Sequence, residues 1–136
     1  MAHISKVKYL GYGFYRYKGK CQFKVHKKSL AKMKNRLRAI TNRNKAISNE
    51  ERPLIPKRFV KGWVNYFKLA DMKKLLMKMD EWIRRRIRAI YWKQWKKVKT
   101  RCRMIRQYNL PDWKVHELAD CQKGIWRAAL MLLFIS

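Results

Sequence analysis

The chain has 136 residues, with 36 Lys and Arg against 8 Asp and Glu and a formal net charge of +28 at pH 7. Because 48% of the residues are hydrophobic and 13% are aromatic, the composition excludes a disordered basic tail and allows one packed domain. Such a charge predicts a polyanionic partner, and nucleic acid is a commoner one than an acidic protein or a membrane surface.

The cysteines and the apolar runs bear on where the protein acts. Cys21, Cys102 and Cys121 are far apart and form no CxxC pair. This pattern argues against a zinc site or a disulfide framework and indicates a reducing compartment. The apolar run at residues 128–135 is too short to span a bilayer, and early lysines interrupt any signal-like segment. We therefore expect a cytoplasmic protein with no membrane partner.

Residues 1–27 are predicted to form a β-hairpin. Residues 7–17 are rich in aromatic and β-branched side chains, and residues 21–25 alternate apolar with polar ones. Lys18-Gly19-Lys20 between them matches a tight turn. Since an isolated hairpin is marginal in water, we expect it either to pack on the helices that follow or to belong to a larger sheet.

Residues 28–136 are predicted to form a small helical bundle. Ser29 is the expected N-cap of the first helix. Ser48 and Glu51 match a capping box, after which Pro53 and Pro56 should break or delay the entry into the second helix. The second helix has an apolar stripe that consists of Phe59, Val60, Trp63, Val64 and Phe67. We expect Trp63 and Phe67 to be core residues.

A long basic helix is predicted next, with Asp71 as its cap, Met72 as its first residue and residues 99–101 at its end. Its apolar stripe consists of Met72, Leu75, Leu76, Met79, Ile83, Ile87 and Ile90. At about 100° per residue, the opposite face would hold Arg84, Arg88, Trp92, Trp95 and Lys99. Between Trp82 and Arg106 the chain has eleven Lys or Arg, three Trp and no carboxylate, a composition that favours phosphate binding and base stacking.

A break at residues 109–111 precedes another predicted short helix at residues 113–121, and Lys123-Gly124 leads into the final apolar run. His3, His26 and His116 have no partners at metal-ligand or triad spacing, so we expect ordinary surface residues. The predicted fold class is therefore mainly α, with an N-terminal β-hairpin followed by a small helical bundle that contains one long basic helix.

Several sequence blocks occur in a specific order. They are SNEER at 48–52, GWVNYF at 62–67, DEWIRRR at 80–86, WKQWK at 92–96, KTR at 99–101 and KGIWR at 123–127. Together they resemble the maturase-specific region of group II intron-encoded reverse transcriptases, also called domain X or thumb, over roughly residues 29–128. The segment YLGYGF at 9–14 resembles the end of the reverse transcriptase palm.

The resemblance implies a domain that binds structured group II intron RNA and promotes splicing and intron mobility. It also implies a palm and fingers as partners if the chain is part of a longer reverse transcriptase. The family copies RNA into DNA with an aspartate pair in a Y-x-D-D motif, which this sequence lacks. We therefore expect no catalytic residue, no metal ligand and no cofactor in this chain, with Mg²⁺ only where a palm is joined.

Two departures from the family pattern concern Pro53 with Pro56 and the apolar ending, which a degenerate terminus would explain. No HNH nuclease segment follows, so DNA cleavage is not expected. Alternative functions are a thumb piece that holds an RNA–DNA hybrid for a polymerase, a general basic nucleic-acid-binding protein, and an inert remnant of a mobile element.

The predicted RNA-binding residues are Arg84, Arg85, Arg88, Trp92, Trp95, Lys96, Lys99, Thr100, Arg101, Tyr66 and Asn65. Several of them have a competing structural interpretation. The arginines would form a solvated cationic face, and the C-terminal helix would cover at least one of Trp92 and Trp95, because Trp is usually buried. The cations at residues 99–101 would stabilise the negative end of the long helix.

Overall fold

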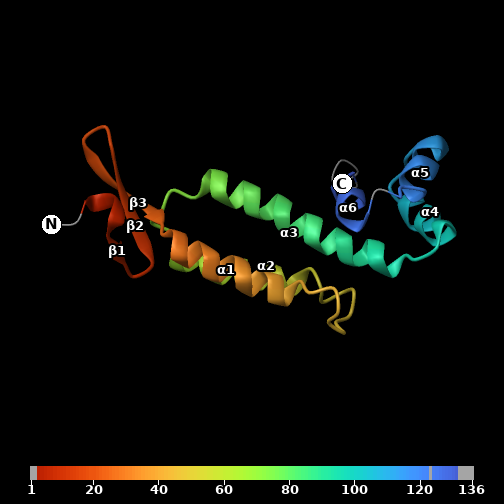
Figure 1. Ribbon diagram of the computed structural model, residues 1–136, viewed down its shortest axis with the longest axis horizontal. Helices are drawn as coiled ribbons and strands as arrows, with labels where there is room; N and C mark the ends of the chain where they lie inside the picture. The colour runs from red at the N-terminus through yellow and green to blue at the C-terminus, as the bar shows by residue number, and fades with distance from the viewer. Residues whose placement is uncertain (1–2, 123, 132–136) are drawn as a thin grey trace. The chain divides into compact units, whose positions relative to one another are not determined.

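The computed structural model describes residues 3–122 and 124–131 (Figure 1). A small antiparallel sheet comes first, and helices joined by loops follow it, which confirms the predicted mainly α class. The chain divides into two compact units. The first comprises the residues up to 41 together with 47–78, and the second comprises 42–46 together with the residues from 79 onward. The separate division at residue 27, based on the family resemblance, stays a prediction.

The sheet contains the predicted hairpin and one additional strand. A 3-10 turn at Ile4–Lys6 precedes β1 (Lys8–Tyr9), β2 (Tyr12–Tyr17) and β3 (Lys20–Val25), which pair antiparallel in the order β1-β2-β3. The turn at Lys18-Gly19 is confirmed, with positive φ at both residues. The single strand expected over residues 7–17 is wrong, because the chain reverses at Leu10 and Gly11, where φ is 49° and 87°.

Gly11 is required where the sheet meets the helices. Its φ of 87° is one that glycine adopts without steric cost. A Cβ at this position would lie 3.0 Å from both Phe67 Cζ and Ser29 Oγ. Ser29 Oγ also donates a hydrogen bond of 2.9 Å to the Gly11 carbonyl. The absence of a side chain therefore allows the β1–β2 turn to approach the helices closely.

Two helices, α1 (Lys27–Ile40) and α2 (Leu54–Tyr66), belong to the first unit, where aromatic residues pack between the sheet and α2. The buried residues Phe67, Ala70 and Met72 form one cluster. Half-buried residues of the sheet and helices pack against it, namely Tyr12, Val25, Trp63, Val64 and Leu76. The hairpin therefore packs on the helices that follow it, and Trp63 and Phe67 lie in the core as predicted.

The start of α1 differs from the prediction. His26 is the N-cap, since its Nδ1 accepts a hydrogen bond of 3.2 Å from the Lys28 backbone amide. The assignment of Ser29 as the cap is wrong, because its hydroxyl bonds to the sheet instead. Partial burial, and next the positive charge of Lys8, lowers the pKa of His26. The direction of this shift favours the neutral imidazole, the form whose Nδ1 can accept the hydrogen bond.

The entries into the next two helices are delayed. Ser48 Oγ accepts a hydrogen bond of 3.3 Å from the Glu51 amide, as the capping box predicts, but α2 begins only at Leu54. The long helix α3 (Lys73–Gln94) begins one residue later than expected. The Met72 carbonyl accepts its first hydrogen bond, so the assignment of Asp71 as the cap is wrong by one residue.

The second unit contains the C-terminal part of α3 and three shorter helices, α4 (Val98–Arg106), α5 (Asp112–Ala119) and α6 (Ile125–Met131). Its buried cluster consists of Trp92, Cys102, Ile105, Val115, Leu118, Ala119 and Ala128. Lys123 and residues 132–136, parts of the predicted ending, lie outside the described residues. In the described ranges, no helix is both long and apolar enough to cross a membrane.

Candidate nucleic-acid interface

The basic run from Trp82 to Arg106 forms two helices rather than one. The helix α3 ends at Gln94, Lys97 has an extended backbone, and α4 begins at Val98. On a straight helix, Trp92 and Ile105 would be about 20 Å apart at 1.5 Å per residue. Both belong to the same buried cluster, so the chain has to turn back between them.

This turn corrects two predictions about the cations. Trp95 and Lys99 do not share a helical face with Arg84 and Arg88, because they lie beyond the end of α3. Residues 99–101 lie in the first turn of α4, so they cannot stabilise the C-terminal end of a long helix. The roles of Lys99 and Arg101 therefore have to be inferred from their contacts within the second unit.

The two tryptophans differ in exposure. Trp92 is only 3% exposed and belongs to the cluster to which α6 contributes Ala128. Trp95 is half-buried against the same cluster, with its ring stacked on that of Tyr91 at a centroid distance of 6.3 Å. The expectation that the C-terminal helix helps to cover at least one tryptophan is therefore correct for Trp92. Trp95 retains more surface for contact with a base.

Arg101 connects three segments of the second unit. Its guanidinium lies 4.3 Å from the centroid of the Trp92 ring. Its Nε donates a 2.8 Å hydrogen bond to the Trp95 carbonyl, and Nη1 donates one of 3.3 Å to the Ala119 carbonyl. A planar guanidinium can make these contacts together, whereas a lysine ammonium cannot. Arg101 therefore holds the turn after α3 against both α3 and α5.

Arg85 makes a similar connection between α3 and α6. Its guanidinium carbon lies 4.3 Å from the centroid of the Trp126 ring, and its Nε is 3.5 Å from the Trp126 carbonyl oxygen. A cation over the face of a tryptophan ring is stabilised by about 0.5–2 kcal/mol, depending on exposure. Arg85 thus contributes to the attachment of α6, in addition to its predicted role in RNA binding.

Arg84 and Arg88 lie one helical turn apart on α3. Arg84 forms an ion pair of 2.9 Å with Asp80, but both side chains are more than half exposed, so the pair contributes little. Burial, followed by the charge of Arg84, lowers the pKa of Arg88. Arginine nevertheless stays protonated at neutral pH. Arg84 thus presents its charge at the surface of α3, whereas Arg88 is half-buried.

The other predicted residues lie in less constrained places. Lys96 and Lys99 are exposed and Thr100 is half-buried near the start of α4. Asn65 and Tyr66 belong to the first unit, at the end of α2. The Tyr66 hydroxyl donates a hydrogen bond of 3.0 Å to the Leu10 carbonyl, although 57% of the residue is exposed. Tyr66 thus joins α2 to the sheet and still presents an aromatic surface.

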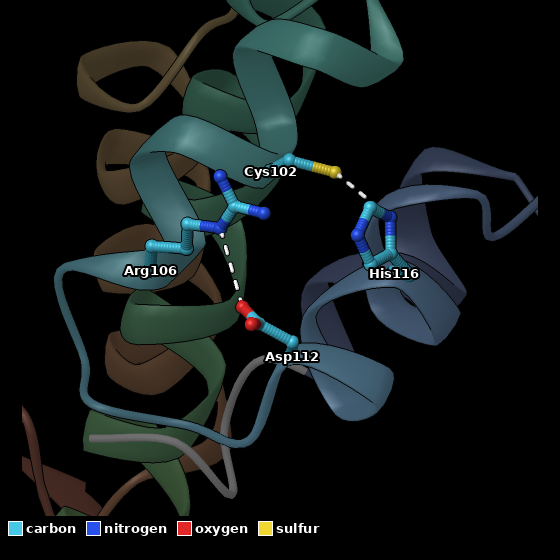
Figure 2. A network of polar contacts seen from close by, with 4 residues as sticks. All are labelled: Cys102, Arg106, Asp112 and His116. Carbon is cyan, nitrogen blue, oxygen red and sulfur yellow. Dashed lines mark hydrogen bonds and ion pairs between the residues drawn. The ribbon is translucent and has the colours of Figure 1, made fainter.

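A cleft next to α4 contains residues that the sequence did not single out. Arg103 and Arg106 follow Lys99 at helical spacing, which is the signal that could have identified them. Figure 2 shows Arg106 and Cys102 on α4 opposite Asp112 and His116 on α5. Arg106 Nε is 3.4 Å from Asp112 Oδ1. Cys102 Sγ is 3.7 Å from His116 Nδ1, and His116 is exposed, as predicted for a surface residue.

The acidic, histidine and cysteine side chains of the described residues do not form a metal-binding cluster. Within residues 3–122 and 124–131, no three such side chains lie close enough together to hold a metal ion. The three cysteines are free thiols, of which Cys102 is buried. The contacts of Arg85 and Arg101 instead involve aromatic rings and backbone carbonyls.

Comparison with known families identifies one match. The family described as "Group II intron, maturase-specific domain" matches residues 30–109, which is more than half of the chain. The match begins within α1 and ends after α4, so α5 and α6 lie outside it. No curated protein matches the chain.

Proposed function

Because the chain belongs to the family of group II intron maturase-specific domains, we propose that it binds structured group II intron RNA and thereby promotes splicing and intron mobility. The observation that carries this proposal is the charge of a folded chain. Eight carboxylates cannot neutralise 36 lysines and arginines, and the excess lies largely on well-formed helices. Closely packed phosphates of a folded RNA are suited to such a surface, because binding releases their condensed counterions.

The contacts distinguish cations that are available to bind phosphates from cations that stabilise the fold. Lys96, Lys99 and Arg84 have exposed side chains that can reach phosphates, whereas Arg85 and Arg101 mainly hold helices together. Trp95, Tyr66 and Asn65 offer partly exposed rings and amides at the edges. Side chains of these kinds recognise loops, unstacked bases and 2′-hydroxyls in RNA.

The experiment that tests this proposal is a titration of the full chain with group II intron RNA at increasing salt. If six to eight phosphates are neutralised, log affinity should fall with log salt at a slope of roughly −4 to −7. A slope near zero would contradict phosphate binding as the main source of affinity. Spliced product formed by the intron RNA with and without the protein then measures the maturase function itself.

The same titration separates the alternatives. Binding to a generic RNA–DNA hybrid as tight as binding to the intron RNA would favour a polymerase thumb, which the packing of a palm-like sheet on α2 supports. Equal binding to heparin would favour a general basic protein, and no binding at all would favour an inert remnant. In a complete reverse transcriptase, palm and fingers would be partners and the palm would hold Mg²⁺. The free thiols support action in the reducing cytoplasm.

A further inference from the structure

The cleft between α4 and α5 has a volume of about 600 Å³. Both helices contribute to its walls, and the lining consists of Val98, Lys99, Thr100, Cys102, Arg103, Arg106 and His116. A volume of several hundred Å³ is in the range of small-ligand sites and is large enough for a nucleotide. The cleft thus has room for one unit of an RNA chain.

The α4 wall carries a row of three cations. Lys99, Arg103 and Arg106 are spaced i, i+4 and i+7, so they extend over about 10 Å of one helical face. One strand of a nucleic-acid duplex has a phosphate about every 3.4 Å along its axis. The row is therefore long enough to contact two or three successive phosphates. The helix α4 contains no carboxylate to compete for these cations.

Asp112, the carboxylate next to this row of cations, does not prevent the row from binding phosphates. Asp112 is 3.4 Å from Arg106 Nε, but the Asp112 side chain is 80% exposed and that of Arg106 is 55% exposed. An exposed pair of this kind contributes at most about 1 kcal/mol, which a phosphate can replace. Figure 2 shows that Arg106, Asp112 and His116 surround a common space between the two helices.

The α5 wall offers a flat ring. His116 is exposed, and its Nδ1 lies 3.7 Å from the Sγ of the buried Cys102. Histidine is one of the side chains on which unpaired RNA bases stack. An aromatic ring opposite a row of cations is the combination that binds a nucleotide through both its base and its phosphate. The helix α5 lies beyond residue 109, where the family match ends.

We propose that the α4–α5 cleft receives one unpaired nucleotide of the bound RNA. Its base stacks on His116, and its flanking phosphates contact Lys99, Arg103 and Arg106. The inference rests on the proposed RNA-binding function and adds to it a specific preference for a bulged or looped nucleotide. That preference is independent of the general attraction between the +28 chain and any RNA.

The test compares two RNA hairpins that differ only by one bulged nucleotide, with fluorescence anisotropy as the measurement. The full chain should bind the bulged hairpin at least about fivefold more tightly, the lower limit of what one stacked base contributes. His116→Ala should abolish this preference, and His116→Phe should retain it because the stacking face remains. Lys99→Gln with Arg103→Gln should reduce the preference and make the salt slope shallower by about 1.4.

A matched control removes the same charge elsewhere. Lys73→Gln with Lys74→Gln, at exposed positions of the first unit, should leave the preference for the bulge unchanged. Circular dichroism melting verifies that each variant is folded. Equal binding of both hairpins by the unmodified chain, or an unchanged preference in the cleft variants, would overturn the inference while leaving RNA binding intact. Failure to bind either hairpin or the intron RNA would instead overturn the proposed function.

Discussion

Replacing Arg101 with methionine should destabilise the second unit without any RNA present. Methionine keeps an unbranched apolar stem but loses both hydrogen bonds and the cation over Trp92. The 2.8 Å bond to the Trp95 carbonyl accounts for about 1.5 kcal/mol, as a charge-assisted bond of a half-buried side chain. The cation–π contact adds about 1 kcal/mol, and the 3.3 Å bond to Ala119 adds less.

We therefore expect a loss of about 3 kcal/mol in the free energy of unfolding, a large share of the stability of a small domain. At a urea dependence of about 2 kcal/mol per molar, the midpoint of unfolding should fall by about 1.5 M. Arg101→Lys should lose about half as much, because an ammonium cannot reproduce the planar, forked contacts.

Urea titration followed by tryptophan fluorescence and far-UV circular dichroism measures this change. Arg103→Met is the control, since it removes an exposed cation two residues away and should change the stability by no more than about 0.5 kcal/mol. An Arg101→Met variant that unfolds at the same urea concentration as the unmodified chain would refute the assignment. In that case a loss of RNA affinity would show that Arg101 acts mainly on the ligand.

Three further predictions concern single contacts. Gly11→Ala should destabilise the first unit by about 1–3 kcal/mol in urea titrations, because of its positive φ and close neighbours, whereas Gly62→Ala, in open space within α2, should stabilise it by up to about 1 kcal/mol. Equal effects of the two would contradict the close approach at Gly11. Since the pKa of His26 is lowered on folding, the unfolded chain binds the proton first, and stability should fall as the pH drops below the usual value of 6.5. His26→Asn, which keeps a capping acceptor, should flatten this part of the pH profile, and an unchanged profile would exclude His26 as its source. A double-mutant cycle with Arg85→Met and Trp126→Leu should show a coupling of about 0.5–1 kcal/mol by chemical denaturation, and additive effects would exclude the ring contact.

Local patterns in the sequence were sufficient for much of the fold. The Lys18-Gly19 turn and the apolar stripe that includes Trp63 depend on neighbours close in the chain, and both are found as predicted. The reversal at Gly11 was missed because the segment 7–17 has continuous strand propensity and contains a second glycine. What distinguishes Gly11 is its contact with Phe67, which is far away in sequence.

The candidate interface was also harder to predict, because it depends on contacts between residues that are far apart in sequence. The turn between Gln94 and Val98 contains neither Gly nor Pro, so helical periodicity continues through it in the sequence. That continuity placed Lys99 on the wrong helix. The sequence also does not distinguish Arg101 from the other ten cations of its segment. Only the turn, which brings the Arg101 guanidinium over the Trp92 ring, shows its structural role.

The contacts of Arg85 and Arg101 also determine how this protein can be redesigned. A variant with fewer cations would be easier to purify free of cellular RNA and easier to crystallise, because excess positive charge promotes non-specific association. Exposed positions such as Lys96 and Lys73 are suitable for replacement by glutamine. Arg85 and Arg101 should be kept as arginine, since each places its guanidinium over a tryptophan ring and connects separate helices.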